Sequence, residues 1–258
     1  MKKALIVVSF GTSYKETREK TIEAVEKRMA ERFPECDVFR AFTSNMVIKK
    51  IKENEGVKIP TVNQLMIELK EKGYKEVFMQ PLHVINGSEY SKAFHQAQHF
   101  KNDFDVIKVG KPLMTEFEDY EAIVEWLRDL AQPLKENEAV VLMGHGTHHA
   151  AFTAYACLDH MLYKDPVYIC AVESYPGVDT VVEKLKEVNI EKVYLHPFML
   201  VAGDHATNDM ASDEEDSWKS QLTKEGFVVE PILKGMGEYP KIQNMFLAHA
   251  EKVIEGGE

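Results

Sequence analysis

Three ionisable side chains in this sequence each stand directly after a run of apolar residues, at the point where a buried strand is expected to end. They are His145 in Gly144-His145-Gly146, Glu173 after the run 167–172, and His205 in Gly203-Asp204-His205-Ala206. Flanking glycines let the backbone turn sharply and leave an imidazole room to face a ligand. We expect these three strand ends to meet and to hold a metal ion.

Two imidazoles and one carboxylate form a mixed nitrogen and oxygen ligand set. Such a set suits Co²⁺, Ni²⁺, Fe²⁺ or Zn²⁺ and does not choose among them. Three protein ligands leave open coordination positions, as a catalytic or metal-delivering site requires. Each residue also has a structural alternative: His145 as a turn-stabilising histidine, Glu173 as a solvated carboxylate, and His205 in a helix-cap region.

The other histidines are less informative. His148 and His149 follow His145 closely and are given a supporting role. His95 and His99 are one helical turn apart, which suits only an adventitious surface metal. The remaining histidines are interpreted as surface or core residues: His83, His160, His196 and His249. The acidic run 209–216 is interpreted as the solvated face of a helix spanning 208–222, with charges that favour its N-terminus.

Strand and helix patterns alternate along the whole chain, which predicts parallel sheets covered by helices. The expected strands are 4–9, 37–42, 76–82, 106–109, 139–143, 167–172, 192–200 and 228–232. Amphipathic helical patterns lie between them, the clearest at 14–33, 61–72, 117–131 and 178–188.

An internal repeat organises these elements. The segment that begins at Ala4 matches the one at Ala139, Ala41 matches Ala171, and Val77 matches Val193, in the same order. We therefore expect an α/β fold of two similar lobes, residues 1–133 and 134–258, each with a four-stranded parallel sheet. The repeat pairs Phe10 with His145, Thr43 with Glu173, and Glu89 with His205. All six are expected at carboxyl ends of strands, where α/β proteins bind ligands, lining an active-site cleft between the lobes.

Composition excludes some classes of function. The chain of 258 residues has a net charge of −11, which argues against nucleic-acid binding. Its three separated cysteines indicate reduced thiols, and no apolar stretch is long enough to span a membrane. The short apolar run after Met1 lacks the features of a signal peptide, so we expect a cytoplasmic protein. A nucleophile elbow is absent, which disfavours a hydrolase.

The sequence resembles the anaerobic cobalt chelatases of the CbiK family, which act on sirohydrochlorin. The resemblance covers the whole chain and is carried by 9–13, 144–147, 173–177 and, most specifically, 196–210. It implies a bilobal fold shared with class II ferrochelatases and insertion of Co²⁺ without an organic cofactor. It also implies metal ligands at His145, Glu173 and His205, with His145 accepting pyrrole protons. Some members are periplasmic and bind haem; the absence of a leader makes this chain similar to the cytoplasmic type.

Two further roles follow as hypotheses. Glu89 is expected to help move protons as a second catalytic residue. Substrate carboxylates are expected at Phe10, Gly11, Thr12 and Ser13, where a turn that opens a helix offers backbone N–H groups. Alternatives remain open: insertion of Fe²⁺ or Ni²⁺ at the same site, or a metal-binding or metallochaperone protein that handles no tetrapyrrole. The sequence does not decide the oligomeric state, including a homo-oligomer, or whether haem is bound.

Overall fold

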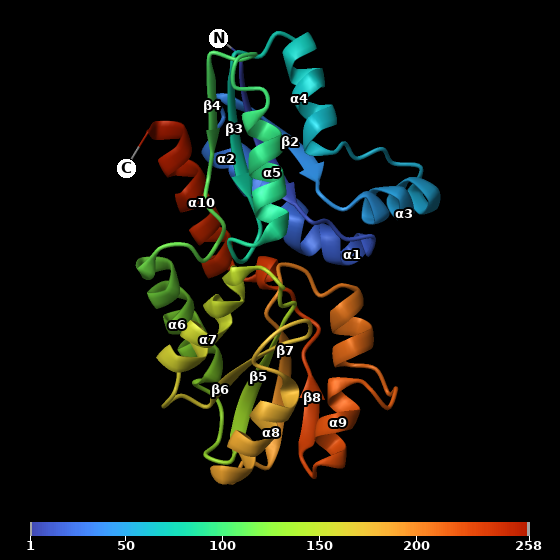
Figure 1. Ribbon diagram of the computed structural model, residues 1–258, viewed down its shortest axis with the longest axis vertical. Coiled ribbons are helices and arrows are strands. Elements are labelled where there is room, and N and C mark those ends of the chain that lie inside the picture. The colour runs from blue at the N-terminus through green and yellow to red at the C-terminus, as the bar shows by residue number, and fades with distance from the viewer. Residues whose placement is uncertain (1, 257–258) are drawn as a thin grey trace. The chain divides into compact units, whose positions relative to one another are not determined.

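The computed structural model describes residues 2–256, which form two compact units (Figure 1). Unit 1 comprises 1–115 and 237–258 without the undescribed terminal residues, and unit 2 comprises 116–236. In unit 1 the elements are β1 (Lys3–Ser9), α1 (Lys15–Arg18), the π-helix η1 (Glu19–Glu23), α2 (Ala24–Arg32), β2 (Cys36–Phe42), α3 (Asn45–Glu55), α4 (Val62–Glu71), β3 (Glu76–Pro81), α5 (Ser88–Gln98), β4 (Val106–Val109) and α10 (Pro240–Glu255).

Unit 2 repeats this plan. Its elements are α6 (Phe117–Ala131), β5 (Glu138–Gly144), the 3-10 helix η2 (Ala150–Phe152), α7 (Thr153–Met161), β6 (Val167–Ala171), α8 (Val178–Glu187), β7 (Lys192–Pro197), the π-helix η3 (Ala206–Met210), α9 (Trp218–Lys224) and β8 (Val228–Pro231). A 3-10 turn, η4 (Met236–Glu238), joins the units. Both sheets are parallel and four-stranded, in the orders β2-β1-β3-β4 and β6-β5-β7-β8, which confirms the predicted fold class.

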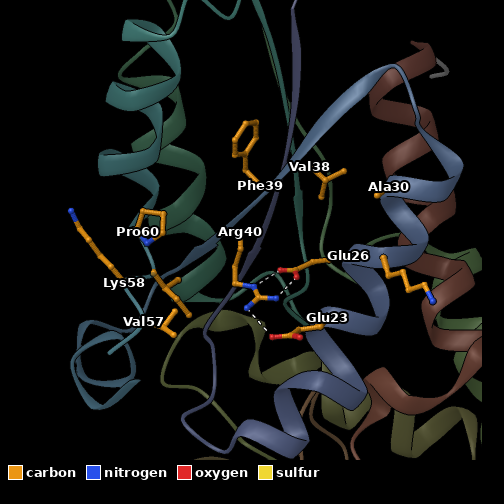
Figure 2. A pocket seen from close by; sticks show the side chains of 11 residues that line it. Glu23, Glu26, Ala30, Val38, Phe39, Arg40, Val57, Lys58 and Pro60 are labelled. Carbon is orange, nitrogen blue, oxygen red and sulfur yellow. Dashed lines mark hydrogen bonds and ion pairs between the residues drawn. The ribbon is translucent and has the colours of Figure 1, made fainter. Parts of the chain in front are cut away.

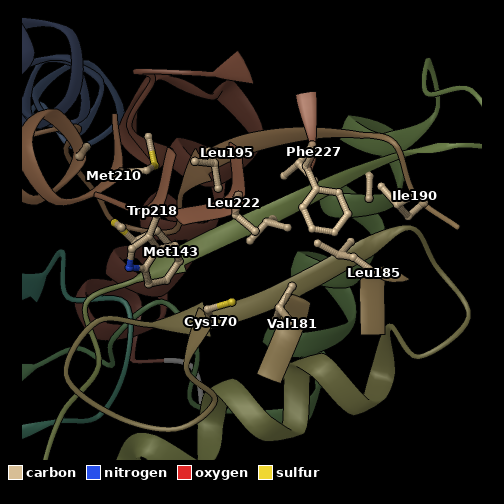
Figure 3. Packing of buried hydrophobic residues seen from close by; sticks show 14 of the residues in the cluster. Met143, Cys170, Val181, Leu185, Ile190, Leu195, Met210, Trp218, Leu222 and Phe227 are labelled. Atoms are coloured by element: carbon tan, nitrogen blue, oxygen red, sulfur yellow. The ribbon is translucent and has the colours of Figure 1, made fainter. Parts of the chain in front are cut away.

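The central strand of each sheet is buried on both faces because helices cover both. In unit 1, the even-numbered residues of β1 pack with α4 and α5, while Leu5 and Val7 are buried on the opposite face. In unit 2, Met143 belongs to a core with Trp218 and Leu222 of α9 and with Val181 of α8 (Figure 3). Continuous apolar runs such as 4–8 follow directly from this two-sided burial.

The contacts within the chain divide it elsewhere than at the expected boundary between residues 133 and 134. Helix α6 follows the last strand of unit 1, yet it packs with α7 and β6 of unit 2. Helix α10 closes the chain but packs on β3, β4 and α2 of unit 1. An amphipathic pattern shows that a helix buries one face, but it does not show which sheet that face covers.

Strand register refines the predicted repeat. Ser9 pairs with Phe42 in unit 1, and Gly144 pairs with Ala171 in unit 2. With Ser9 equivalent to Gly144, the structural counterpart of Glu173 is therefore Ser44, one residue beyond the predicted Thr43. The match of β3 with β7 needs no shift, because Val8 pairs with Pro81 as Met143 pairs with Pro197.

The expected helix over 208–222 is wrong. The chain forms the short π-helix η3, continues through turns and bends, and starts a new helix only at Trp218. Ser217 explains the restart, since its Oγ donates to the carbonyl of Ser212 and accepts from the N–H of Ser220 as the N-cap of α9. Most of the acidic run therefore lies in a loop rather than on a helix face.

Candidate metal centre at the carboxyl edge of unit 2

The three predicted ligand residues of unit 2 lie at one edge of its sheet, and we call His145, Glu173 and His205 the unit 2 edge. Backbone pairing continues beyond β6, because Glu173 N–H donates to the carbonyl of His145 over 2.9 Å. Glu173 Oε2 lies 3.7 Å from His145 Nδ1. The His145 and His205 rings meet edge to face, with centroids 4.7 Å apart and planes at 88°. The side chains of His145, Glu173 and His205 are between 36% and 46% exposed, so they remain accessible to solvent.

Gly146 makes this arrangement possible. Its φ of +85° lies in the left-handed region, and a Cβ there would stand 2.8 Å from the Ser174 nitrogen and 2.9 Å from the Glu173 nitrogen. The loops after β5 and β6 are also tied together, since Thr147 N–H donates to Ser174 Oγ over 3.3 Å. A glycine after His145 thus lets the loop that carries Glu173 approach the imidazole closely.

Hydrogen bonds at Nδ1 orient both imidazoles. His145 Nδ1 lies 3.1 Å from the carbonyl of Gly146, and His205 Nδ1 lies 2.5 Å from Asp209 Oδ2. Carbonyl and carboxylate oxygens only accept, so these contacts favour the tautomer with the proton on Nδ1. Both rings then present an Nε2 lone pair, the atom that binds a metal or takes up a proton.

Within the part of the chain that the structure describes, no group of three or more His, Cys, Asp or Glu side chains is arranged to hold a metal ion as it stands. The structure therefore brings His145, Glu173 and His205 together in contacting pairs without forming a coordination sphere. The donor types suit a divalent transition metal, and binding requires the side chains to turn their free nitrogens and oxygens toward it.

The other predicted site residues lie in unit 1. Glu89 stands in the first turn of α5. It is equivalent to His205, because each is the second residue after a glycine, Gly87 or Gly203, whose carbonyl accepts from the N–H four residues later. The segment Phe10 to Ser13 follows β1, and Thr12 Oγ1 accepts from the N–H of Tyr14 over 3.2 Å. Phe10 is 44% exposed. Any role of these residues stays a prediction.

The sequence patterns do not predict the environment of two residues near these edges. Asp209 falls in the acidic run, yet it follows His205 by four residues, about one turn of helix, and its carboxylate contacts that imidazole. No sequence pattern distinguishes His83 from an ordinary histidine. His149 caps the start of η2, since its Nδ1 accepts from the N–H of Ala151.

A groove of about 520 Å³ elsewhere in unit 1 is lined by Arg40 (Figure 2). Its guanidinium is already bound by two carboxylates, with Nη1 3.0 Å from Glu23 Oε1 and Nε 2.7 Å from Glu26 Oε1. Burial raises the pKa of Glu26 despite the nearby arginine. The Arg40 guanidinium is therefore already paired with carboxylates of the groove, and the groove has no pair of imidazoles like His145 and His205.

Comparisons with known proteins agree on one group of metal-handling proteins. The family model described as cobalt chelatase (CbiK) matches residues 3–255. A sirohydrochlorin cobaltochelatase of Salmonella typhimurium is 46% identical over 98% of this chain and 97% of its own length. Sirohydrochlorin cobaltochelatase CbiKC of Nitratidesulfovibrio vulgaris is 32% identical over 98% of this chain and 91% of its own length.

Solved structures share the fold at low sequence identity. SirB from Bacillus subtilis with Fe³⁺ has a TM-score of 0.66 and 16% identity, covering 99% of this chain and 97% of that one. CbiX, the terminal enzyme for biosynthesis of sirohaem in denitrifying bacteria, has a TM-score of 0.61 and 15% identity, covering 97% and 99%. None of the helices in 2–256 has the length and apolar character needed to cross a membrane.

Proposed function

We propose, since this chain belongs to the cobalt chelatase (CbiK) family, that the ring into which it inserts Co²⁺ is sirohydrochlorin. The chain is a cobalt chelatase of tetrapyrrole biosynthesis, and the product fits the anaerobic route to cobalamin. We class the enzyme as a lyase, a sirohydrochlorin cobaltochelatase, with Co²⁺ as a substrate and no organic cofactor. The observation that carries the proposal is the near full-length identity of 46% to a protein of that activity.

The metal ligands in this proposal are His145, Glu173 and His205. Support comes from their contacts at one sheet edge and from the two Nδ1 hydrogen bonds, which leave both Nε2 atoms to face an incoming ion. Two nitrogens and one carboxylate bind Co²⁺ without using all of its coordination positions. Ring nitrogens would enter at the open positions, and the protein ligands would then leave the metal.

Insertion also requires two pyrrole N–H protons to leave the ring. We assign His145 as one acceptor because an imidazole nitrogen with a free lone pair can act as a general base toward a ring N–H. The Glu173 carboxylate 3.7 Å from Nδ1 stabilises the imidazolium that forms. Glu89 is the second candidate for moving protons, and Lys92 Nζ lies 3.9 Å from its Oε2.

Asp209 has a positioning role in this scheme. Its carboxylate accepts from His205 Nδ1, which fixes the ring and leaves Nε2 as the nitrogen free to bind a metal. Carboxylate partners of this kind raise the basicity of a ligand imidazole and restrict its rotation. Asp209 therefore helps to bind the metal without contacting it.

A comparison of initial rates tests the proposal. Sirohydrochlorin is mixed with Co²⁺, Fe²⁺ or Ni²⁺ under anaerobic conditions, and the visible spectrum is followed with and without the protein. We expect acceleration with Co²⁺ above the rate with either other metal. Faster insertion of Fe²⁺ or Ni²⁺ would favour the same site acting in a different pathway. Metal binding with no effect on any tetrapyrrole spectrum would favour a metallochaperone. The cytoplasmic location and the oligomeric state stay predictions of the sequence.

A further inference from the structure

Four residues of unit 1 carry buried side-chain atoms that have no hydrogen-bond partner among the residues the structure describes. These atoms are Ser9 Oγ, Thr43 Oγ1, both ring nitrogens of His83, and Glu89 Oε2. One more such atom, Gln80 Oε1, lies within β3 and faces Gly110. The first four residues follow or end strands, or open the helix after one, so they belong to a single edge of the sheet.

Backbone contacts place the four residues around the end of β1. Thr43 N–H donates to the Ser9 carbonyl over 2.9 Å. Leu82 N–H donates to the Val8 carbonyl over 2.7 Å, which sets His83 on the other side of Ser9. Lys92 of α5 donates to the carbonyl of Thr43 over 3.0 Å and so ties Glu89, in the same helix, to this group. We call Ser9, Thr43, His83 and Glu89 the unit 1 edge.

Unpaired polar atoms are expensive in a folded protein. A buried donor or acceptor without a partner costs about 1–3 kcal/mol. Burial also lowers the pKa of His83 to about 4, so its imidazole is neutral at physiological pH and offers one N–H donor. Unsatisfied buried groups call for an explanation, and these lie at the carboxyl edge of a parallel sheet, where such folds bind ligands.

We propose that the unit 1 edge binds a carboxylate on the rim of the tetrapyrrole, which accepts hydrogen bonds from Ser9, Thr43 and His83. The inference rests on the proposed function for the identity of the ligand. Two hydroxyls and one neutral N–H match the several lone pairs of a carboxylate. Lys92 adds a positive charge beside Thr43 and offsets the charge of Glu89, whose own acceptor atom stays available for a ring proton.

Two shape-preserving variants test this site. Thr43→Val and His83→Phe remove the donors and keep most of the volume. Binding of metal-free sirohydrochlorin is measured by absorbance titration, and the free energy of unfolding by urea denaturation. We expect each variant to bind the tetrapyrrole about 5- to 10-fold more weakly, as the loss of one hydrogen bond predicts. We expect stability to stay the same or rise, because an unpaired buried group has been removed.

Thr21→Val is the matched control. Thr21 is also a fully buried threonine of unit 1, but its Oγ1 already donates to the carbonyl of Thr17 over 2.5 Å. This variant should lose stability and bind sirohydrochlorin like the wild type. The opposite pattern in Thr43→Val and His83→Phe, reduced stability with unchanged affinity, would overturn the proposed subsite and assign these groups to structure alone.

The failure of this inference is distinguishable from that of the proposed function. If the wild type binds sirohydrochlorin and inserts Co²⁺ while the variants bind the ring equally well, only the proposed subsite is contradicted. If the wild type does not bind sirohydrochlorin, both the subsite and the proposed function are contradicted. Co²⁺ titration in the absence of the ring provides a third measurement, and we expect both variants to bind the metal as the wild type does.

Discussion

In unit 2 the loop after the central strand begins with His145, and in unit 1 the same position holds Phe10. Glu173 has Ser44 as its counterpart, and His205 has Glu89. Both units share the strand order and a glycine with positive φ after the central strand, at Gly11 and Gly146. The backbones differ after β3 and β7, because unit 1 forms the continuous helix α5 whereas unit 2 forms the π-helix η3 followed by a loop.

The polar groups of the two edges also differ in their hydrogen-bond partners and in their exposure to solvent. At the unit 2 edge, both imidazoles have Nδ1 partners and are partly exposed. At the unit 1 edge, the hydroxyls of Ser9 and Thr43 and both nitrogens of His83 are buried without partners. A partnered, accessible imidazole suits a mobile cation, whereas unpaired neutral donors suit an uncharged or anionic group that arrives with its own acceptors. Under the proposed function, the unit 2 edge suits the cobalt ion and the unit 1 edge suits a group on the tetrapyrrole.

The largest expected effect comes from making the unit 2 edge resemble unit 1. His145→Phe places the unit 1 side chain at the equivalent position and removes the residue proposed both as a metal ligand and as a proton acceptor. We expect cobalt insertion to fall at least about 100-fold, because losing a ligand should exceed the 10- to 100-fold loss typical of its outer partners. The rate is measured with sirohydrochlorin and Co²⁺, and circular dichroism checks the fold.

Phe10→Ala is the control on the other edge and should change Co²⁺ binding little. A His145→Phe variant that inserts cobalt at the wild-type rate would remove His145 from the mechanism. His205→Ala should behave like His145→Phe, since it removes the second imidazole of the same edge.

Asp209 sharpens the comparison, because the equivalent position in unit 1 holds Ala93. Asp209→Ala should weaken Co²⁺ binding about 10- to 100-fold by freeing the His205 ring. Calorimetric titration measures the affinity, and the nitrogen chemical shifts of His205 report whether the proton leaves Nδ1. Asp213→Ala serves as the control within the same acidic run, since Asp213 is exposed and pairs with Lys219. Unchanged affinity and an unchanged tautomer in Asp209→Ala would exclude the positioning role.

Much of the fold can be predicted from the sequence. Continuous apolar runs indicate strands buried on both faces, and apolar residues at 3.6-residue spacing indicate amphipathic helices. The repeat also placed Glu89 and His205 correctly, because no insertion separates β3 from α5 or β7 from its following turn. The pairing of Thr43 with Glu173 failed by one residue, since hydrogen-bond register rather than side-chain similarity sets equivalence. The assignment of α6 and α10 to units depends on long-range packing, which amphipathicity does not encode.

The candidate site can be predicted from the sequence only as far as strand ends indicate it. His145, Glu173 and His205 follow apolar runs, and the topology then brings them to one edge. The contact of Asp209 with His205 forms at a π-helix, in a segment whose composition predicts a continuous surface helix. His83 is distinguished by burial without a partner, a property of the three-dimensional environment that has no signature in sequence.

Glycine substitutions compare the backbone turns of the two units at Gly11 and Gly146. Gly146→Ala should lower stability by about 1–3 kcal/mol, because it combines backbone strain with a Cβ that meets the backbone of the Glu173 loop. Gly11→Ala should be destabilising to a similar extent, since its Cβ would lie 2.4 Å from the buried Phe42 ring. Only Gly146→Ala should also reduce Co²⁺ affinity. Gly226→Ala, with positive φ and open space around it, isolates the strain alone. Equal metal affinity in Gly146→Ala and wild type would contradict the proposed link between this turn and the Glu173 ligand.

The smallest expected effect concerns the buried imidazoles, one in each unit. Burial lowers the pKa of His83 and of His196 to about 4. In the unfolded chain a histidine has a pKa of about 6.5, so the unfolded state takes up the proton first and stability falls as pH drops from about 6.5 toward 4. Between pH 6 and pH 5 each of these imidazoles should lower the free energy of unfolding by about 1 kcal/mol.

His83→Phe should remove the contribution of His83 to this pH dependence and gain stability at pH 5, because the nitrogens of His83 have no hydrogen bond to lose. His196→Phe should flatten the slope equally but lose stability at pH 7, since His196 Nδ1 donates to the carbonyl of Pro197 over 3.0 Å. Urea denaturation at both pH values measures the difference, and identical behaviour of the two variants would show that His83 is not an unpaired group.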